Sequence, residues 1–496
     1  MKDTNKIQRQ VERILDENRQ RTLSIIVQGR REGLQQTLLD AAQRAIERRA
    51  ITNAADLLPP PAKGRRGAKA SERVSADVRS LRAKGAAAIE PMTAASFVQN
   101  SRLARRSDAS GRMRPLLMSG SAAMEIDRDD LAKLPQALPQ ALAVFANRLV
   151  PVPPKMRAKV LPAQVEQRST HTWGLEATGA LACWGAFGAR GQGVRVAVLD
   201  TGVDPSHPDL ANRLARFAEF DGKGQLVAEG VSAARDTDGH GTHVCGTIAG
   251  GRASGRWIGM APECKLLVAK VLGRAGGTDE QILKGMEWAV AQGAEIINMS
   301  LSGLSFEPSV LDTYTSAIIA ARQAGIPVVA SVGNDGAQTS GSPGNDYFAL
   351  TVGAIDVNDR VAAFTAGRTQ VVQESDAIEA RNLPLVYSKP DLVAPGVHVL
   401  SSIVTKRWEH LNGTSMAAPH VAGALALLLS RTPAAKRDAV LLGLAGWDLS
   451  DTLMQLLVGS VTDQGENGLD HRYGHGKLSV LSAFGHAVAR GYLPKG

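Results

Sequence analysis

The sequence predicts an α/β fold, a three-layer sandwich in which a mainly parallel sheet is covered by helices on both faces, preceded by a small α+β domain. The main prediction rests on two features of the chain, the apolar character of its strand-like segments and their alternation with helical patterns. From Gly191 onwards, segments rich in Val, Ile and Leu alternate with helical patterns. Strands that are buried on both faces of a parallel sheet have this near-continuous apolar character. The 496 residues leave room for two to four domains.

Four apolar segments are predicted as strands of this sheet, with helices between them. The strands are expected at 194–199, 265–272, 294–301 and 327–332. One helix opens at Thr278, where Gln281 three residues later completes a capping box, and another covers 309–323. Ligands of such sheets bind outside the carboxyl ends of the strands. Functional residues are therefore expected just after these strands.

The N-terminal region, residues 1–153, is predicted as a smaller domain interrupted by an insertion. Its expected elements are a strand at 23–27, a helix at 32–49, a strand at 122–126, a short helix capped by Asp127, and extended pieces at 143–146 and 149–152. Residues 51–115 contain three consecutive prolines, a basic run and many small residues, which indicates a flexible basic insertion. Residues 154–172 are polar and aperiodic, and are predicted as a linker.

Positive charge is concentrated in this N-terminal region. Residues 1–120 hold 24 Lys and Arg against 12 Asp and Glu, whereas the whole chain has a net charge of +9. A basic stretch raises the alternative of a nucleic-acid-associated protein. Phe97 is the one aromatic residue of this stretch, so it lacks the stacking platforms that bind nucleic-acid bases. Nucleic acid is therefore not the expected partner.

Composition also sets expectations for the cellular compartment. The three cysteines are too few for a disulfide scaffold and indicate reduced thiols. No apolar run reaches the roughly 18 residues that a membrane span needs, and the N-terminus lacks the apolar core of a signal peptide. We expect a cytoplasmic protein without a membrane partner.

Three residues are candidates for the functional site of such a sheet. Asp200 directly follows the strand at 194–199, His240 stands between two glycines, and Ser415 precedes an apolar helix. A serine hydroxyl becomes a nucleophile when a neutral imidazole takes its proton and a third group orients that imidazole. Asp, His and Ser in this chain order provide such an arrangement.

The residues around these three positions resemble the signature blocks of the subtilisin-like serine proteases, or subtilases. The blocks are VLDTGVD at 198–204, HGTHVCGT at 240–247 and GTSMAAPH at 413–420. The resemblance covers about 170–490 and implies the subtilisin-like fold and a serine endopeptidase whose triad is Asp200, His240 and Ser415. It implies that Asn334, in SVGNDG, is the oxyanion-hole asparagine.

The same resemblance implies the substrate-binding residues. The segment INMSLSG resembles the edge that pairs with the substrate backbone. The pocket for the side chain before the scissile bond is expected to be lined by Ser300, Leu301, Ser302, Gly303, Gly333 and Gly341. Subtilases often have Gly where Ser302 stands, so the resemblance does not predict the width of this pocket. Acyl transfer to an amine, as in peptide ligases of this family, stays open as an alternative to hydrolysis.

Residues 1–153 resemble the prodomain of the family, which assists folding and then blocks the active site with its C-terminal tail. The resemblance implies a zymogen that is processed in the linker, between Lys155 and His171, ahead of a catalytic domain at 173–490. The expected partners are a protein or peptide substrate and the chain's own N-terminal region as inhibitor.

No cofactor is expected, because the serine mechanism needs none. Asp209 matches a carboxylate that some subtilases use to bind calcium. The second ligand loop would fall at 251–256, where the sequence GRASGR has no carboxylate and two cations. Calcium is therefore possible but unsupported, and no metal ligand is assigned. His243, His420 and Cys245 are expected to be buried structural residues.

Overall fold

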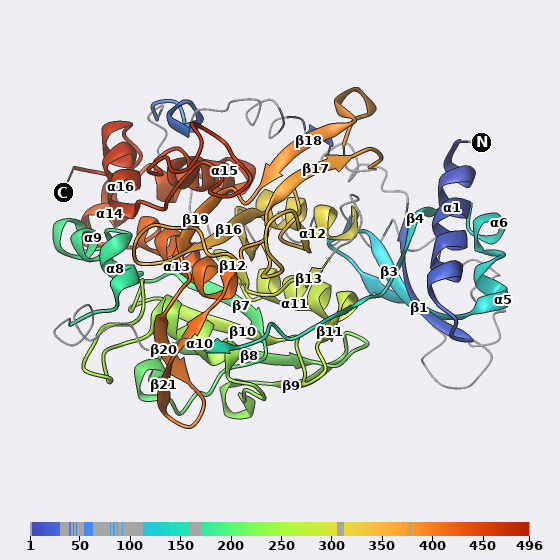
Figure 1. Ribbon diagram of the computed structural model, residues 1–496, viewed down its shortest axis with the longest axis horizontal. Helices are drawn as coiled ribbons and strands as arrows, with labels where there is room; N and C mark the ends of the chain where they lie inside the picture. The colour runs from blue at the N-terminus through green and yellow to red at the C-terminus, as the bar shows by residue number, and fades with distance from the viewer. Residues whose placement is uncertain are drawn as a thin grey trace.

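The computed structural model describes residues 2–29, 54–62, 113–139, 141–157, 170–304, 312–375 and 378–495, with a few single residues between 39 and 92. Figure 1 shows a large body, which contains the central sheet, and a smaller N-terminal lobe beside it. Most of the predicted helix at 32–49 and most of the predicted insertion at 51–115 lie outside the described residues. Of the insertion, the structure describes the short helix η1 (Ala54–Leu57) with residues 58–62, single residues between 80 and 92, and residues 113–115, where the strand β2 (Arg114–Leu116) begins.

The body is built on an eight-stranded sheet in the order β19-β16-β14-β12-β7-β10-β8-β9. All of its neighbours are parallel except β8 and β9. The strands are β7 (Arg195–Asp200), β8 (Leu214–Phe220), β9 (Leu226–Glu229), β10 (Lys265–Lys270), β12 (Ile296–Met299), β14 (Val328–Ser331), β16 (Leu350–Ile355) and β19 (Leu392–Pro395). The four predicted strands are thus confirmed as β7, β10, β12 and β14.

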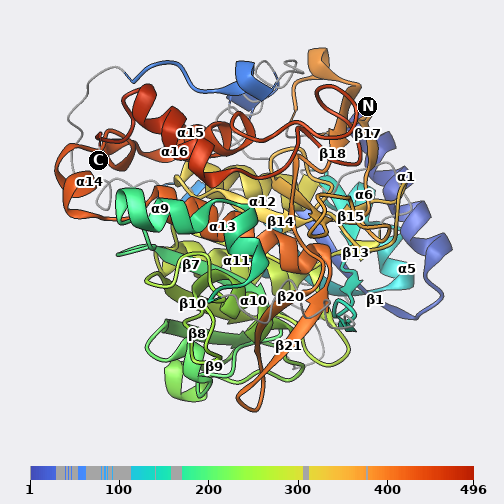
Figure 2. The ribbon, with the colours of Figure 1, turned by 60° about the vertical axis from the view of Figure 1, so that its left-hand side comes forward.

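Helices cover both faces of this sheet. Successive residues of each strand point to opposite faces, so each strand contributes side chains to the cores on both sides. Val196 and Val198 of β7 lie in the core beneath α10 (His240–Ala249) and α13 (Thr414–Leu428). Ala197 and Leu199 lie in the core beneath α11 (Asp279–Ala291) and α12 (Asp312–Gln323). The predicted three-layer arrangement is confirmed, and Figure 2 shows it from a second direction.

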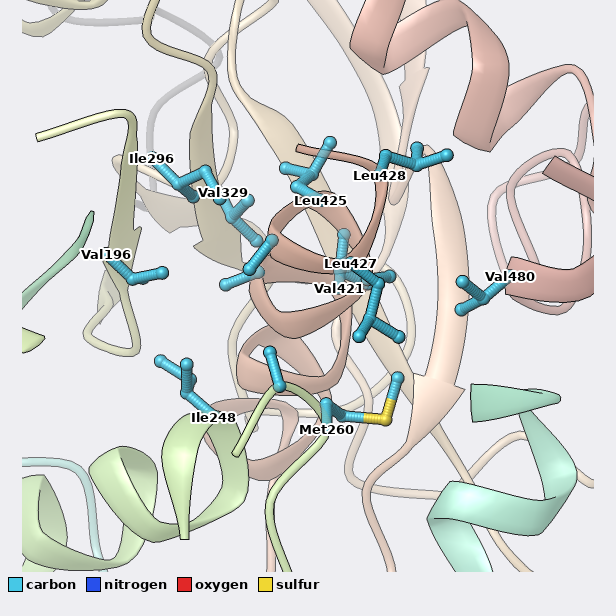
Figure 3. Close-up of a cluster of buried hydrophobic side chains, with 14 of the residues drawn as sticks. Val196, Ile248, Met260, Ile296, Val329, Val421, Leu425, Leu427, Leu428 and Val480 are labelled. Atoms are coloured by element: carbon cyan, nitrogen blue, oxygen red, sulfur yellow. The ribbon is translucent and has the colours of Figure 1, made fainter. Parts of the chain in front are cut away.

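Helix α13 runs through the centre of the first core. Its Val421 and Leu425 face Val196, Ile296 and Val329 of the sheet (Figure 3). The outer helices on this side are α8 (Trp173–Ala177), α9 (Ala180–Phe187), α14 (Pro433–Asp438), α15 (Gly446–Val458) and α16 (Val480–Ala489). Because α13 is buried along its whole length, its first residues are held firmly against the ends of the strands.

Smaller strand pairs border the sheet. They are β11 (Gly277–Thr278) with β5 (Leu149–Val150), β13 (Gly303–Leu304) with β15 (Gly341–Ser342), β17 (Arg368–Val372) with β18 (Leu385–Lys389), and the hairpin β20 (Val399–Ile403) and β21 (Arg407–Asn412) with β6 (Met156–Arg157). The pairing of β5 with β11 joins the N-terminal region to the body, and the pairing of β6 with β21 joins the predicted linker to it. The predicted capping box of Thr278 and Gln281 opens α11, which confirms that helix start.

The N-terminal lobe is an antiparallel sheet in the order β2-β3-β1-β4. Its elements are α1 (Lys2–Glu17), β1 (Thr22–Gly29), β2 (Arg114–Leu116), β3 (Ser121–Asp127), α5 (Arg128–Leu131), α6 (Leu134–Ala137) and β4 (Ala141–Ala146). One face packs on α1 and α6 through Ile25 and Val27, and the other contributes Ile26 to the core of α11 and α12. Asp127 stands at the predicted cap position of α5, but no side-chain cap bond forms, and its carboxylate accepts a hydrogen bond from Thr22 instead.

Among the described residues, no helix has both the length and the apolar character that crossing a membrane requires.

Candidate active site

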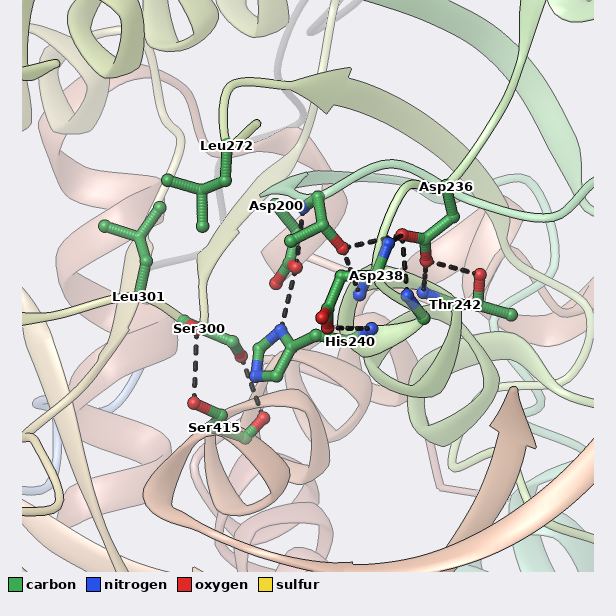
Figure 4. A network of polar contacts seen from close by, with 12 residues as sticks. Asp200, Asp236, Asp238, His240, Thr242, Leu272, Ser300, Leu301 and Ser415 are labelled. Atoms are coloured by element: carbon green, nitrogen blue, oxygen red, sulfur yellow. Dashed lines mark hydrogen bonds and ion pairs between the residues drawn. The ribbon is translucent and has the colours of Figure 1, made fainter. Parts of the chain in front are cut away.

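Three elements bring Asp200, His240 and Ser415 together at the carboxyl edge of the sheet (Figure 4). Asp200 is the last residue of β7, His240 is the first residue of α10, and Ser415 is the second residue of α13. All three side chains are at least 98% buried. A Cβ atom on Gly241 would lie 2.2 Å from the backbone oxygen of Gly202, so a glycine at this position lets α10 approach the end of β7.

The first pair of this group is already formed. Nδ1 of His240 lies 2.8 Å from Oδ1 of Asp200. Because the carboxylate is an acceptor, Nδ1 carries the proton in this pair and Nε2 of the neutral ring keeps its lone pair. Nε2 is buried and has no hydrogen-bond partner among the described residues. The ring is therefore oriented as a base with a free acceptor nitrogen.

The hydroxyl of Ser415 has a different partner in this structure. Its Oγ donates to the backbone oxygen of Ser300 at 3.2 Å. The backbone oxygen of Ser415 in turn accepts a 2.9 Å hydrogen bond from the Ser300 hydroxyl. A serine side chain can redirect its hydroxyl by rotating about one bond, and catalytic hydrogen bonds often tighten only when substrate is bound.

Negative charge surrounds the imidazole of His240. Burial alone would lower the pKa of His240, but the charge and the hydrogen bond of Asp200 oppose burial, with further contributions from Asp238 and Asp236, and the pKa is raised above its usual value. The arrangement thus stabilises the imidazolium that forms when His240 accepts a proton.

Asp236, which was not predicted as a site residue from the sequence, holds the loop before His240. Its Oδ1 accepts from the Thr201 hydroxyl and from the backbone N–H groups of Asp238 and Gly239, and its Oδ2 accepts from Thr242. These hydrogen bonds lower the pKa of Asp236 although burial opposes them. Asp236 thereby ties α10 to the segment after β7. The closely spaced acidic residues before Gly239 were the available signal.

Asn334 lies beside the start of α13. Its Oδ1 accepts from the backbone N–H of Thr414 at 2.9 Å and from the Thr414 hydroxyl at 3.0 Å. This fixes the orientation of the amide, because the oxygen faces Thr414 and Nδ2 faces Gly413. Nδ2 is therefore left as a donor beside Gly413, two residues before Ser415.

The predicted pocket residues come from three segments that meet. Residues 300–303 follow β12, Gly333 follows β14, and Gly341 begins β15, which pairs with β13. A Cβ atom on Gly333 would lie 3.2 Å from Oγ of Ser302, and one on Gly341 would lie 1.8 Å from it. The structure therefore brings the predicted residues together, with the Ser302 hydroxyl among them.

His243, His420 and Cys245 are fully or almost fully buried. Nε2 of His243 lies 3.1 Å from two backbone oxygens, and Nδ1 of His420 lies 2.8 Å from the Met416 oxygen. Burial lowers the pKa of His243 to about 3 and that of His420 to about 4. Burial raises the pKa of the Cys245 thiol. All three therefore have the structural character expected of them.

Asp209 does not offer a free carboxylate. Its Oδ1 accepts a hydrogen bond from the backbone N–H of Ala253 at 2.5 Å, and its Oδ2 accepts one from Nε1 of Trp408 at 2.6 Å. Across the described ranges, no group of three or more His, Cys, Asp or Glu side chains could hold a metal ion.

The mainly parallel sheet carries an Asp–His pair, a buried serine and an oriented amide at its carboxyl edge. This arrangement is typical of a serine hydrolase.

Comparison with known proteins supports this class. Residues 191–476 match the model of the subtilase family. The major intracellular serine protease of Bacillus subtilis is 37% identical over 252 residues, 49% of this chain and 71% of that protein. Subtilisin DY of Bacillus licheniformis is 38% identical over 253 residues, 50% of this chain and 81% of that protein.

The chain therefore belongs to the subtilase family and is a serine endopeptidase that acts on peptides or proteins. Another similar protein is the intracellular serine protease of Paenibacillus polymyxa, which is 35% identical over 282 residues, 55% of this chain and 78% of that protein. The matched family region begins after residue 190, so it does not include the N-terminal lobe.

Proposed function

We propose that Asp200, His240, Ser415 and Asn334 carry out the hydrolysis. Nε2 of His240 takes the hydroxyl proton as Oγ of Ser415 attacks the peptide carbonyl. Asp200 stabilises the resulting imidazolium, and Nδ2 of Asn334 and the backbone N–H of Ser415 hold the oxyanion. His240 then passes the proton to the leaving amine, and a water molecule, deprotonated by His240, releases the acyl group from Ser415.

The observation that carries this proposal is the oriented His240 ring. Its Nδ1 lies 2.8 Å from Asp200, and its Nε2, which has no hydrogen-bond partner among the described residues, points towards Ser415 (Figure 4). The test is incubation with a peptide library, read by mass spectrometry. We expect wild-type protein to cleave peptides and Ser415→Ala to lose about 10⁶-fold in turnover, as in a well-studied member of this family. Cleavage by Ser415→Ala at the wild-type rate would refute the assignment.

We further propose that the N-terminal region inhibits the catalytic domain of the same chain. Support comes first from the packing of the lobe on α11 and α12. Arg114 of β2 forms an ion pair with Glu280 at 2.7 Å, and the Glu280 side chain is fully buried. The backbone N–H of Met118 donates to Glu287 at 3.0 Å. A buried carboxylate that depends on a partner from the lobe favours a specific interface.

Further support comes from residues 147–157, which we call the tail. The tail pairs with the body at two places, through β5 with β11 and through β6 with β21. Before the first pairing, Arg148 makes hydrogen bonds of 3.0 and 3.2 Å to Asp279. Between the two pairings, Lys155 forms a 3.0 Å ion pair with Asp238, two residues before His240.

Each of these two pairings lies close to residues of the candidate active site. Val150 of β5 is 1% exposed and lies against Gly303, next to the predicted pocket. Met156 of β6 pairs with Asn412, three residues before Ser415. A tail that is bound on both sides of Ser415 would exclude substrate. Because the tail is part of the chain, it would compete at a high effective concentration.

The proposal includes no cofactor, because the four side chains and water complete the reaction. Calcium at Asp209 is not part of it, since the second ligand loop, at 251–256, has no carboxylate.

We also propose that the protease works in the cytoplasm. Two of its similar proteins are described as intracellular serine proteases. Its three cysteines are free and buried, as is usual in a reducing compartment. Cell fractionation with an antibody against the chain tests this, and recovery outside the cytoplasmic fraction would contradict it.

A further inference from the structure

Ser302 occupies a special position in the predicted substrate pocket. It stands between β12 and β13, at the point where the segments of Gly333 and Gly341 converge. Subtilases often have glycine here, so the Ser302 side chain adds atoms that such a pocket would lack. Where these atoms lie decides how they affect substrates.

The Ser302 hydroxyl fills space that the neighbouring glycines leave open. A Cβ atom on Gly341 would lie 1.8 Å from Oγ and 3.1 Å from Cβ of Ser302. A Cβ atom on Gly333 would lie 3.2 Å from the same Oγ. The hydroxyl therefore stands over both glycines at once, on the side where their side chains would be.

This hydroxyl is also buried without a hydrogen-bond partner among the described residues. The hydroxyl groups of the nearby serines do have hydrogen-bond partners. The Ser300 hydroxyl donates to the Ser415 backbone oxygen at 2.9 Å, and that of Ser331 donates to the Leu301 oxygen at 3.4 Å. Buried hydroxyl groups normally find a partner, because an unmade hydrogen bond is costly. The position of the Ser302 side chain therefore has no explanation in local hydrogen bonding.

We propose that Ser302 shortens the pocket for the residue before the scissile bond, so that the enzyme selects small side chains there and excludes large aromatic ones. This inference rests on the proposed function and on the predicted pocket, to which Gly333 and Gly341 belong. A few atoms suffice for such selection, since one methylene group in a pocket changes kcat/KM by about 10–200-fold.

The test compares two peptides that differ only in Ala or Phe before the scissile bond. The full-length chain is first incubated until its peptidase activity is constant. We expect wild type to favour the Ala peptide by about tenfold or more in kcat/KM. In Ser302→Gly the ratio should move towards Phe by about tenfold or more, and Ser302→Ala should lie between.

The ratio is measured on one preparation of each variant, so it does not depend on how much of that preparation is folded. An unchanged ratio in Ser302→Gly, or a wild type that prefers Phe, would overturn the inference while cleavage itself still depends on Ser415. If Ser415→Ala cleaved both peptides as well as wild type, the proposed function would fail instead.

Discussion

At the scale of single residues, His240 is the group on which most interactions of the site converge. Asp200 binds its Nδ1, Asp238 accepts a hydrogen bond from its backbone N–H, and Asp236 fixes the loop that leads to it. The three carboxylates also act through charge, and they raise the pKa of His240 against the effect of burial. Catalysis requires neutral His240, so activity should fall as the pH drops through this raised pKa.

Removing one of these charges should shift the pH profile in a known direction. Asp238→Asn keeps an oxygen for the His240 backbone N–H but removes a negative charge. The imidazolium is then less stable, the pKa of His240 falls, and the acid limb of kcat/KM moves to lower pH. Asp448→Asn is the control, because Asp448 is exposed on α15 and is not among the charges that act on His240. A shift to higher pH, or equal shifts in both variants, would refute this explanation.

Asn334 should act on the transition state alone. Asn334→Leu removes the donor that we propose faces the developing oxyanion, so turnover should fall by about 10²–10³-fold with little change in KM. Steady-state kinetics on one peptide measures both quantities. Asp335→Asn, a change at the exposed neighbouring residue, should leave turnover unchanged. If KM rises and turnover stays constant, Asn334 binds substrate in its ground state.

The sequence could predict that Asp200, His240 and Ser415 lie at one edge of the sheet, because each stands in a block of its own, next to a strand end or a helix start. It could not predict Asp236, whose partners Thr201 and Thr242 meet only in the fold. Nor could it predict that the Ser415 hydroxyl binds the Ser300 oxygen, since a rotamer depends on the local environment and not on the pattern of residues.

At the scale of elements, β5 joins the tail to the body through side chains that differ sharply in burial. Val150 is 1% exposed and packs in the core of α11 and α12, whereas Leu149 is 61% exposed. The two neighbours therefore allow a matched test of how the tail binds.

Val150→Asp should weaken inhibition by the tail, because it buries an unpaired carboxylate. We expect the initial peptidase activity of the freshly purified chain to rise by roughly tenfold or more, since such burial costs well over 1 kcal/mol. Leu149→Asp, which places the same charge in solvent, should behave as wild type. Equal activity in the two variants would show that β5 does not hold the tail at the candidate active site.

Strands of the central sheet were predictable where both faces are buried, as in β7 with its run of Val, Ala and Leu. The hairpin strand β21 was not, because its sequence RWEHLN is mostly polar and half-buried. The tail strand β6 has only two residues and exists through its pairing with β21. Such strands depend on partners distant in sequence, so local pattern carries little information about them.

At the scale of the whole molecule, the lobe packs on α11 and α12, and the tail pairs with strands of the body near the candidate active site. The sheet of the lobe lies between its own α1 and the helices of the body. Gln28 of β1 is fully buried, and its amide donates to the hydroxyl of Ser316 on α12 at 3.4 Å. An interface of this kind would hold the tail in place until the chain between lobe and body is cut.

We expect that cut between Lys155 and His171, a window that lies mostly outside the described residues. Purified wild type should yield an N-terminal fragment that ends in this window, and Ser415→Ala should stay whole. Gel electrophoresis and intact mass measurement give both results. If both chains stay whole and intact wild type is fully active, the N-terminal region is a permanent recognition domain and not an inhibitor.

The most direct test of the account is covalent labelling of the activated chain with a phosphonyl fluoride, mapped by peptide mass spectrometry. A serine reacts with this reagent when a neighbouring base activates it. We expect one adduct, on Ser415, and its loss in His240→Ala. An adduct on another residue, or unchanged labelling of Ser415 in His240→Ala, would contradict the proposed triad.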